Sequence, residues 1–208
     1  MDKLEGIPAE KRLKIIEAAL NEFGRNGYKK TSVNDVAVAA GISKSMVFHY
    51  FGSKKGMYEY LAEYSMNYMM DSFKAMIPQI MAPTNLDFFE RIRLTTRLKM
   101  QMMREHSQMM LFIVSLYKET EAEVQPLIQT IKDVRGEILQ QVSYENTGEY
   151  KFKDGVEPSL VMKMLNWMVE GYVRTSPINS IELIEALSKE FEESLDLMKR
   201  HFYKEEYL

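Results

Sequence analysis

The sequence contains no cysteine and only three histidines, and each scarcity excludes a class of chemistry. Without cysteine the protein has no disulfide, no thiolate metal site and no cysteine nucleophile. The histidines, His49, His106 and His201, have no spacing that forms a metal site alone, and no glycine-rich phosphate loop is present. We therefore expect no enzyme activity, no catalytic residue, no metal and no cofactor.

Long hydrophobic runs are also missing. No stretch approaches the roughly 18 apolar residues that cross a membrane, and the first residues, MDKLEGIPAEKRLK, lack the apolar core of a signal peptide. Hydrophobic residues nevertheless make up 46% of the 208, which is ample for a globular core. We expect a globular cytoplasmic protein with no membrane partner.

Charge is distributed unevenly along the chain. Residues 1–58 hold 10 Lys+Arg against 6 Asp+Glu, a balance of +4, and the remainder holds 17 against 24, a balance of −7. A basic N-terminal part is typical of a protein that binds nucleic acid there, because phosphates attract lysine and arginine. A solvated helical surface gives the same asymmetry by chance, so charge alone decides nothing.

The most informative segment is residues 31–55, TSVNDVAVAAGISKSMVFHYFGSKK. Ser32 is a favourable N-cap, and Asp35 places a carboxylate at the positive end of the helix that follows. Gly41 provides a permissive helix end, and Ser43 a second N-cap. The pattern predicts two short helices around a glycine turn, the second of a size that fits a DNA major groove.

The second short helix is predicted to span Lys44 to Phe51. Val47 and Phe51 lie one turn apart and are expected to face the core. The opposite face is expected to be free for a partner, and it carries Lys44, Ser45, Met46, His49 and Tyr50.

Helices are predicted along nearly all of the remaining chain. The first spans about residues 9–25, and its inward face is expected to carry Leu13, Ile16, Leu20 and Phe23. A helix from Lys54 towards Ile77 should be broken by Pro78 and Pro83, which cannot continue the hydrogen-bond ladder. Further helices are predicted at 86–104, 108–118, 123–144, 157–175 and 180–203, with a loop at 144–158.

The last two predicted helices suggest a second copy of the chain. Residues 180–203 carry an apolar stripe made of Ile181, Ile184, Leu187, Phe191, Leu195 and Met198. Such a stripe equally fits a helix that covers the core of its own chain. Residues 157–175 are apolar over most of the helix circumference and should be buried on all sides. A four-helix bundle between two copies would bury both helices.

Four features occur together in residues 11–61. These are a first helix, the Asn-Gly-Tyr bend at 26–28, the turn Ala-Gly-Ile-Ser-Lys at 40–44, and the ending Tyr-Phe-x-Ser-Lys at 50–54. Together they resemble the N-terminal domain of the TetR family of bacterial transcriptional regulators. The resemblance implies an all-α fold, with a three-helix helix-turn-helix DNA-binding domain at 1–53. A larger helical ligand-binding and dimerisation domain is expected at 54–208.

The resemblance also assigns DNA contacts. It implies that Thr31, Tyr50 and Lys54 contact phosphates, which fix register, and that Lys44 and Ser45 reach base edges. Plainer interpretations stay open: Thr31 fits a helix cap, Tyr50 fits core packing, and each lysine fits a solvated surface.

The other exposed positions complete the predicted reading face. Met46 and His49 are expected to add an apolar contact to a thymine methyl or a hydrogen bond, although His49 also fits a plain surface residue. Phe48 stands where the family usually has tyrosine, so a common phosphate hydrogen bond is lost and the ring should pack or wedge against sugar. Ser45 stands where glycine is frequent. The operator sequence therefore cannot be taken from a relative.

The resemblance further implies a homodimer on a palindromic double-stranded DNA operator, joined through the two C-terminal helices. The dimer is expected to act as a repressor, released when a small hydrophobic effector binds the larger domain. Seventeen methionines provide adaptable apolar surface for such a pocket. The candidate pocket residues are Met66, Met70, Arg97, Met103, Phe112, Tyr117, Met164, Trp167, Met168 and Glu170. Each also fits an ordinary core or surface position.

The main alternative is a DNA-binding adaptor of the same fold that recruits a protein partner and has no small-molecule inducer. A closed, well-packed larger domain would favour the adaptor. A chamber of several hundred Å³ (on the order of known ligand pockets) lined by methionines and aromatic rings would favour ligand control.

Overall fold

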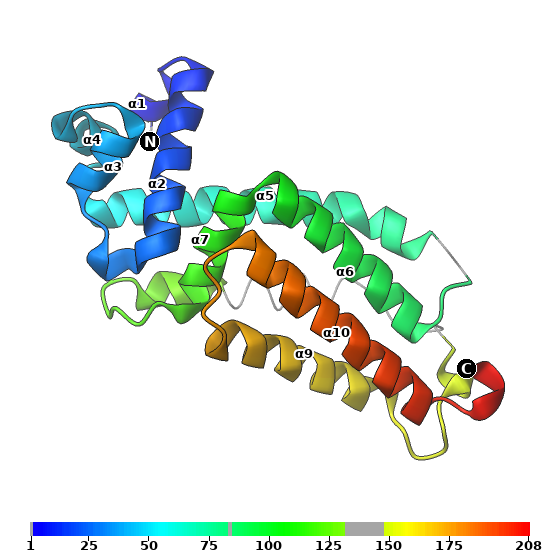
Figure 1. The fold of residues 1–208 in the computed structure, drawn as a ribbon. Coiled ribbons are helices and arrows are strands. Elements are labelled where there is room, and N and C mark those ends of the chain that lie inside the picture. Colours follow the sequence, from blue (N-terminus) through cyan, green and yellow to red (C-terminus); the bar gives the residue numbers. More distant parts are fainter. Residues whose placement is uncertain (1, 83–84, 132–147) are drawn as a thin grey trace. The chain divides into compact units, whose positions relative to one another are not determined.

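The computed structural model describes residues 2–82, 85–131 and 148–208 (Figure 1). Regular secondary structure in these residues is helical, apart from one isolated bridge between Phe152 and Tyr203. The all-α fold class is therefore confirmed. None of the helices described is both long and apolar enough to cross a membrane.

The chain forms two compact units, and each is described by itself. Among the described residues, unit 1 comprises 2–71 and 106–131, and unit 2 comprises 72–82, 85–105 and 148–208. The long helix α5 (Lys54–Met81) contributes residues to both units. The predicted domain boundary between residues 53 and 54 divides a DNA-binding part from an effector-binding part, whereas the two compact units divide the chain elsewhere. The boundary at 53/54 stays a prediction.

Unit 1 contains the predicted DNA-reading segment. Its helices are α1 (Asp2–Glu5), α2 (Ala9–Lys30), α3 (Val33–Ala40), α4 (Lys44–Phe51), the first part of α5, α7 (Ser107–Lys118) and a helical segment at 125–131. In this unit α2 packs against α3 and α7, and α4 packs against α1 and α3. The Tyr58 ring lies edge-on to Phe23 and Phe112, at centroid distances of 5.1 and 5.4 Å, and so joins α2, α5 and α7 in one core.

Helix α2 begins where predicted, at Ala9, but it differs from its predicted form in one inward-facing residue and in its end. Ile16, Leu20 and Phe23 are buried as expected, but Leu13 is 48% exposed, and Ile15 takes the inward position instead. The helix continues past its predicted end, with a kink at Gly27, where φ is 71° and ψ is 176°. This left-handed φ suits glycine and confirms the bend expected at 26–28.

The close packing of α2 on α7 depends on a second glycine. A Cβ added at Gly24 would lie 3.1 Å from the backbone nitrogen of Phe112 and 3.3 Å from its Cα. Because the neighbouring atoms belong to a helix backbone, they cannot rotate away as a side chain would. A side chain at position 24 would therefore push the two helices apart.

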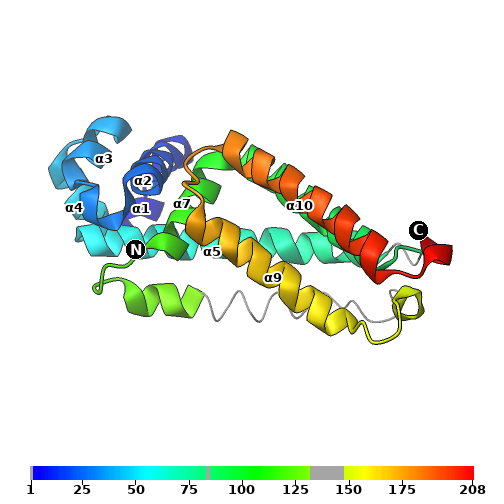
Figure 2. The same cartoon turned by 60° about the horizontal axis from the view of Figure 1, so that its bottom comes forward.

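Unit 2 is built on three long helices, α6 (Phe88–Glu105), α9 (Pro158–Thr175) and α10 (Ile181–Phe202). Figures 1 and 2 both show α9 beside α10, and α10 also packs against α6. Short 3₁₀ turns lie at η1 (Glu149–Lys151) and η2 (Glu205–Tyr207). The core contains Phe88, Phe89, Ile92, Phe152, Val161, Leu165, Phe191, Leu195 and Tyr203. The stripe on α10 thus covers the core of its own chain, one of the two expected roles.

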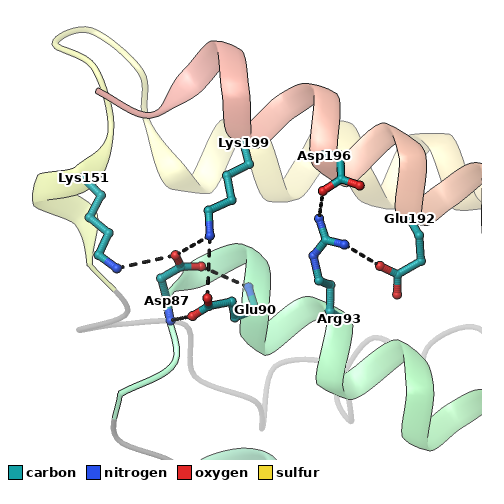
Figure 3. A network of polar contacts seen from close by, with 7 residues as sticks. All are labelled: Asp87, Glu90, Arg93, Lys151, Glu192, Asp196 and Lys199. Atoms are coloured by element: carbon teal, nitrogen blue, oxygen red, sulfur yellow. Dashed lines mark hydrogen bonds and ion pairs between the residues drawn. The ribbon is translucent and has the colours of Figure 1, made fainter. Parts of the chain in front are cut away.

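A polar network fastens the start of α6 to the end of α10 (Figure 3). Asp87 is buried, and its backbone N–H and carboxylate exchange hydrogen bonds with the Glu90 carboxylate and N–H, which caps α6. Lys199 Nζ lies 2.8 Å from the second Asp87 carboxylate oxygen, and Lys151 Nζ lies 3.5 Å from it. Further along α6, Arg93 forks between Glu192 and Asp196 of α10.

Other element boundaries need correction. Helix α5 runs through Pro78 to Met81, because a single missing N–H does not by itself end a long helix. Pro83, residues 132–144 of the helix expected at 123–144, and residues 144–147 of the expected loop lie outside the described residues. Residues 148–157 contain η1 and the bridge at Phe152, so this loop is more ordered than predicted.

Candidate DNA interface

The two short helices of unit 1 begin and end where the sequence predicts. Ser32 Oγ accepts the Asp35 N–H at 3.1 Å and caps α3, which ends at Gly41 with φ of 66°. Ser43 Oγ accepts the Met46 N–H at 3.3 Å and caps α4. Each cap satisfies a backbone donor that the first turn leaves free. The turn between the helices is therefore fixed by local chemistry.

The buried side of α4 differs from the prediction by one residue. Val47 is buried as expected, but its partner on that face is Tyr50, which is only 8% exposed. Phe51 is half-buried, with its ring 5.5 Å from that of Tyr60. Spacings of three and four both place two residues on one face of a helix, and here packing selects three. The expectation of Tyr50 on the open face was wrong, and its plainer interpretation as core packing fits.

The open side of α4 gathers most of the predicted reading residues. Lys44, Ser45 and His49 are exposed, Phe48 is 42% exposed and Met46 is half-buried. Lys44 Nζ lies 6.0 Å from the centre of the Phe48 ring, and Ser45 Oγ lies 2.8 Å from Ser43 Oγ. Exposed donors and an exposed ring share one short helix, which suits contacts to base edges and sugars. That these residues bind DNA stays a prediction.

The surroundings of Thr31 do not support its predicted role as a phosphate contact. The residue is 2% exposed, and Oγ1 lies 2.9 Å from the carbonyl oxygen of Gly27 and 3.0 Å from that of Glu22. The single hydroxyl proton is directed to these carbonyls, and a phosphate has no proton to offer in return. In this conformation the Thr31 hydroxyl ties the end of α2, and a phosphate contact by Thr31 stays a prediction.

The Lys54 side chain contacts other residues of the protein, unlike a lysine that is surrounded by solvent. Its Nζ lies 3.2 Å from the carbonyl oxygen of Lys29 and 4.6 Å from the centre of the Tyr28 ring. An ammonium has three donors, so two remain for a phosphate. Ser53 Oγ accepts the Gly56 N–H at 2.9 Å and begins α5 beside it.

The acidic segment at 119–123, ETEAE, bears on this site and was missed in the sequence. Glu119 Oε2 accepts the Tyr28 backbone N–H at 2.8 Å, and Glu123 Oε2 accepts the Tyr28 hydroxyl at 2.8 Å. Burial, followed by the bond to Glu123, raises the pKa of Tyr28 well above its ordinary value. Three glutamates in five residues were a visible signal, but a run of charges ordinarily marks a solvated turn.

The predicted effector residues divide between the two units. Unit 1 contains Met66, Met70, Phe112 and Tyr117, whereas unit 2 contains Arg97, Met103, Met164, Trp167, Met168 and Glu170. Phe112 is fully buried in the core of unit 1. Its placement supports the structural interpretation of that residue.

Four of these residues have exposed side chains in the single chain, and their part in an effector pocket stays a prediction. They are Arg97, Met164, Trp167 and Glu170. Helix periodicity shows which residues share a face but does not tell whether that face meets the chain's own core or solvent. A hollow of about 620 Å³ does lie in unit 1, beside Leu4, Phe51 and Tyr60, but none of the predicted effector residues lines it.

Helix α9 exposes an apolar stripe. Leu160, Met164 and Trp167 follow one another at spacings of four and three, and Trp167 is 63% exposed. Val161 and Leu165 on the other side of the helix are buried in the core of unit 2. The single chain leaves this side of α9 uncovered, so the prediction that α9 is buried on all sides still depends on a second copy of the chain.

Comparison with known proteins identifies the N-terminal segment. Residues 15–61 match the family model described as bacterial regulatory proteins, tetR family. The chain is 46% identical over 44 residues to the HTH-type transcriptional regulatory protein RaaS of Mycobacterium tuberculosis, covering 21% of this chain and 20% of RaaS. It is 34% identical over 56 residues to IcaR, an HTH-type negative transcriptional regulator of the biofilm operon icaADBC in Staphylococcus aureus, covering 27% and 30%. The match thus spans less than a third of either relative.

The likeness of fold extends over nearly the whole chain. The crystal structure of the transcriptional regulator FadR from Bacillus subtilis, in complex with stearoyl-CoA, superposes with a TM-score of 0.60. The alignment covers 88% of this chain and 96% of FadR at 19% identity, a level that speaks for the fold alone. The matched segment falls on α2, α3, α4 and the start of α5, so residues 15–61 form a DNA-binding domain of the kind that the TetR family of bacterial regulatory proteins carries.

Proposed function

We propose that the protein is a sequence-specific DNA-binding transcriptional regulator that acts as a homodimer on a palindromic operator. The observation that carries the proposal is the open face of α4, where Lys44, Ser45, Phe48 and His49 project from a helix capped at Ser43. A capped helix of two turns enters a major groove with its first residues at the base edges. The match of this segment to the family model supports the same use.

The charge distribution supports contact with the DNA backbone. Residues 1–58 carry a balance of +4, whereas the whole chain carries −3. The phosphates of a duplex attract such a basic surface over a Debye length of about 8–10 Å at ordinary salt. Lys54, which retains two donors, is the proposed phosphate contact nearest to α4.

The exposed stripe on α9 supports the dimer. Leu160, Met164 and Trp167 form an apolar surface at helical spacing on one of the two terminal helices. Two copies that cover this surface against each other around a two-fold axis would bury it. A two-fold dimer also suits a palindromic operator, whose two half-sites lie about 34–36 Å apart in one turn of DNA.

Control by a small hydrophobic effector is the finer part of the proposal. The similar FadR of Bacillus subtilis was crystallised with stearoyl-CoA, and IcaR is a negative regulator. We infer the same kind of mechanism here: the effector binds the larger helical part of the chain, favours a conformation with lower operator affinity, and so relieves repression. A ligand has this effect only if it prefers that conformation.

Selection from a pool of random duplex DNA tests the proposal. The full-length protein should enrich a palindrome whose half-sites are about 10 bp apart, centre to centre. A failure to enrich any sequence would contradict sequence-specific binding. Enrichment of a single half-site without symmetry would contradict the dimer while leaving the α4 face in place.

A further inference from the structure

The kink in α2 leaves one backbone donor outside the helix. Gly27 has φ of 71° and ψ of 176°, so the N–H of the next residue, Tyr28, leaves the direction of the helical ladder. A buried N–H without an acceptor costs free energy. The Glu119 carboxylate provides the acceptor at 2.8 Å, from a position 91 residues further along the chain.

Glu119 is itself held by the turn that follows α7. Its second carboxylate oxygen accepts the backbone N–H groups of Thr120 and Glu121, at 2.8 and 2.9 Å. Gln125 donates from its side chain to the Glu119 carbonyl oxygen at 2.8 Å. Both carboxylate oxygens are therefore occupied by N–H donors, and the side chain is fixed as a bridge between two backbone segments.

Two further contacts come from the same acidic segment. Glu123 accepts the Tyr28 hydroxyl at 2.8 Å, and Glu121 pairs with Lys29 at 3.1 Å. The Lys29 side chain is 79% exposed, so the second pair contributes little. Tyr28, which is buried, is the residue through which the segment holds α2.

The residues held in this way are the ones that position Lys54. Its Nζ lies over the ring of Tyr28 and donates to the carbonyl oxygen of Lys29 at 3.2 Å. A cation over an aromatic face and a hydrogen bond to a carbonyl both require the acceptor to stay in place. Movement of the Tyr28–Lys29 peptide would therefore release the lysine.

We propose that Glu119 is a positioning residue for DNA binding, which holds the Tyr28–Lys29 backbone so that Lys54 meets a phosphate. This inference rests on the proposed function, because it assumes that Lys54 contacts DNA. By this inference the acidic segment at 119–123 strengthens DNA binding, whereas negative charge near the interface would by itself weaken it. Carboxylates near a DNA interface repel phosphates, so neutralising one ordinarily strengthens binding.

The sign of the effect of Glu119→Gln therefore tests the inference. Glutamine has one oxygen and one amide NH₂, so it cannot accept from the Tyr28 N–H and from the N–H groups of residues 120–121 together. One of these two sets of N–H groups would then face the NH₂ group, which accepts no hydrogen bond. Glu119→Gln should weaken the binding of the full-length protein to a random-sequence duplex by about three- to tenfold, a range typical of coupling between neighbouring groups. The matched control, Glu121→Gln, should bind with unchanged or slightly higher affinity.

A double-mutant cycle with Lys54→Ala separates positioning from a general loss of folded protein. In the Lys54→Ala background, Glu119→Gln should have no further effect, and each single change should lower the slope of log Kd against log[salt] by a similar amount. Glu119→Asp, which keeps the charge but shortens the reach, should behave like Glu119→Gln. Equal or tighter binding by both position-119 variants, or additive effects in the cycle, would overturn the inference. If the unchanged protein binds no DNA at low salt, the proposed function itself fails instead.

Discussion

Two side chains at the edge of the helix-turn-helix are held by atoms of the protein itself. Thr31 directs its hydroxyl to the carbonyl oxygens at the end of α2, and Lys54 donates to the Lys29 carbonyl oxygen. A hydroxyl has one proton to give, whereas an ammonium has three. The same local environment therefore leaves Lys54 able to contact a phosphate and directs the only proton of Thr31 inward.

Thr31→Val tests the structural role of this hydroxyl. Valine has nearly the same shape but cannot donate to the Gly27 or Glu22 carbonyl oxygen, so the free energy of unfolding should fall by about 1 kcal/mol. Urea denaturation would measure this loss. The salt dependence of DNA binding should not change, because the Thr31 hydroxyl is directed to carbonyl oxygens of α2. A lower salt slope with unchanged stability would restore the phosphate role.

The residues that sequence reasoning misplaced share a physical cause. A short helix such as α4 has two spacings that reach its inner face, and the choice between Tyr50 and Phe51 depends on neighbours from other helices. Ser32, Gly41 and Ser43 were placed correctly because a cap is decided by the few residues around it. Glu119 could not be found in this way, since its partner is 91 residues distant.

At the scale of the element, a helix pattern tells which side is apolar but not what covers it. The stripe on α10, with Phe191 and Leu195, covers the core of its own chain, whereas the stripe on α9 with Trp167 stays exposed. Both stripes consist of apolar residues at helical spacing, which does not tell what covers them. Only the arrangement of α6, α9 and α10 distinguishes a core face from a candidate interface.

The capping network between α6 and α10 predicts a dependence of stability on pH. Burial raises the pKa of Asp87, but the hydrogen bond from Lys199, the Glu90 N–H and the charge of Lys151 outweigh it and hold the pKa below its ordinary value. A carboxyl with a lowered pKa stabilises the folded state above its ordinary pKa, and this contribution is lost as pH falls through the folded pKa.

Asp87→Asn should therefore be less stable than the unchanged protein at pH 7, by about 2–3 kcal/mol for a lost hydrogen bond to a charged group. The difference should shrink as the pH is lowered into the acid range, which urea denaturation at several pH values would measure. Asp196→Asn, whose carboxylate is 60% exposed, is the matched control and should differ little from the unchanged protein. A difference at Asp87 that is the same at every pH would contradict the account.

At the scale of the whole molecule, the all-α fold class could be predicted from helical periodicity, but the division into two compact units could not. Apolar residues recur at helical spacing almost throughout, so an all-α chain could be predicted. The unit that contains α2, α3 and α4 also includes α7, because Gly24 allows the α7 backbone to approach α2. A single small residue gives no sign in the sequence of which distant helix it will meet.

The exposed stripe on α9 predicts a dimer that a single charge breaks. Trp167→Glu would place a carboxylate at the centre of a buried apolar contact, so the protein should sediment as a monomer at micromolar concentration. The affinity of the Trp167→Glu variant for a palindromic duplex should fall as the dimer is lost. Asn166→Glu adds the same charge to an exposed position about a quarter-turn away on α9, and this variant should remain dimeric. Dimeric Trp167→Glu protein would place the interface elsewhere.

The central claim is that the open face of α4 reads DNA while Lys54 holds the backbone. It is tested most directly by measuring the affinity of Lys44→Ala and Lys54→Ala for a selected palindrome and for a random duplex. Lys44→Ala should lose about 1–3 kcal/mol of preference for the palindrome, because lysine no longer donates to a base edge. Lys54→Ala should weaken binding to both duplexes alike and lower the salt slope by about one, the amount expected for one phosphate. Unchanged affinity and unchanged preference in both variants would contradict the account and place the DNA-binding residues on another surface.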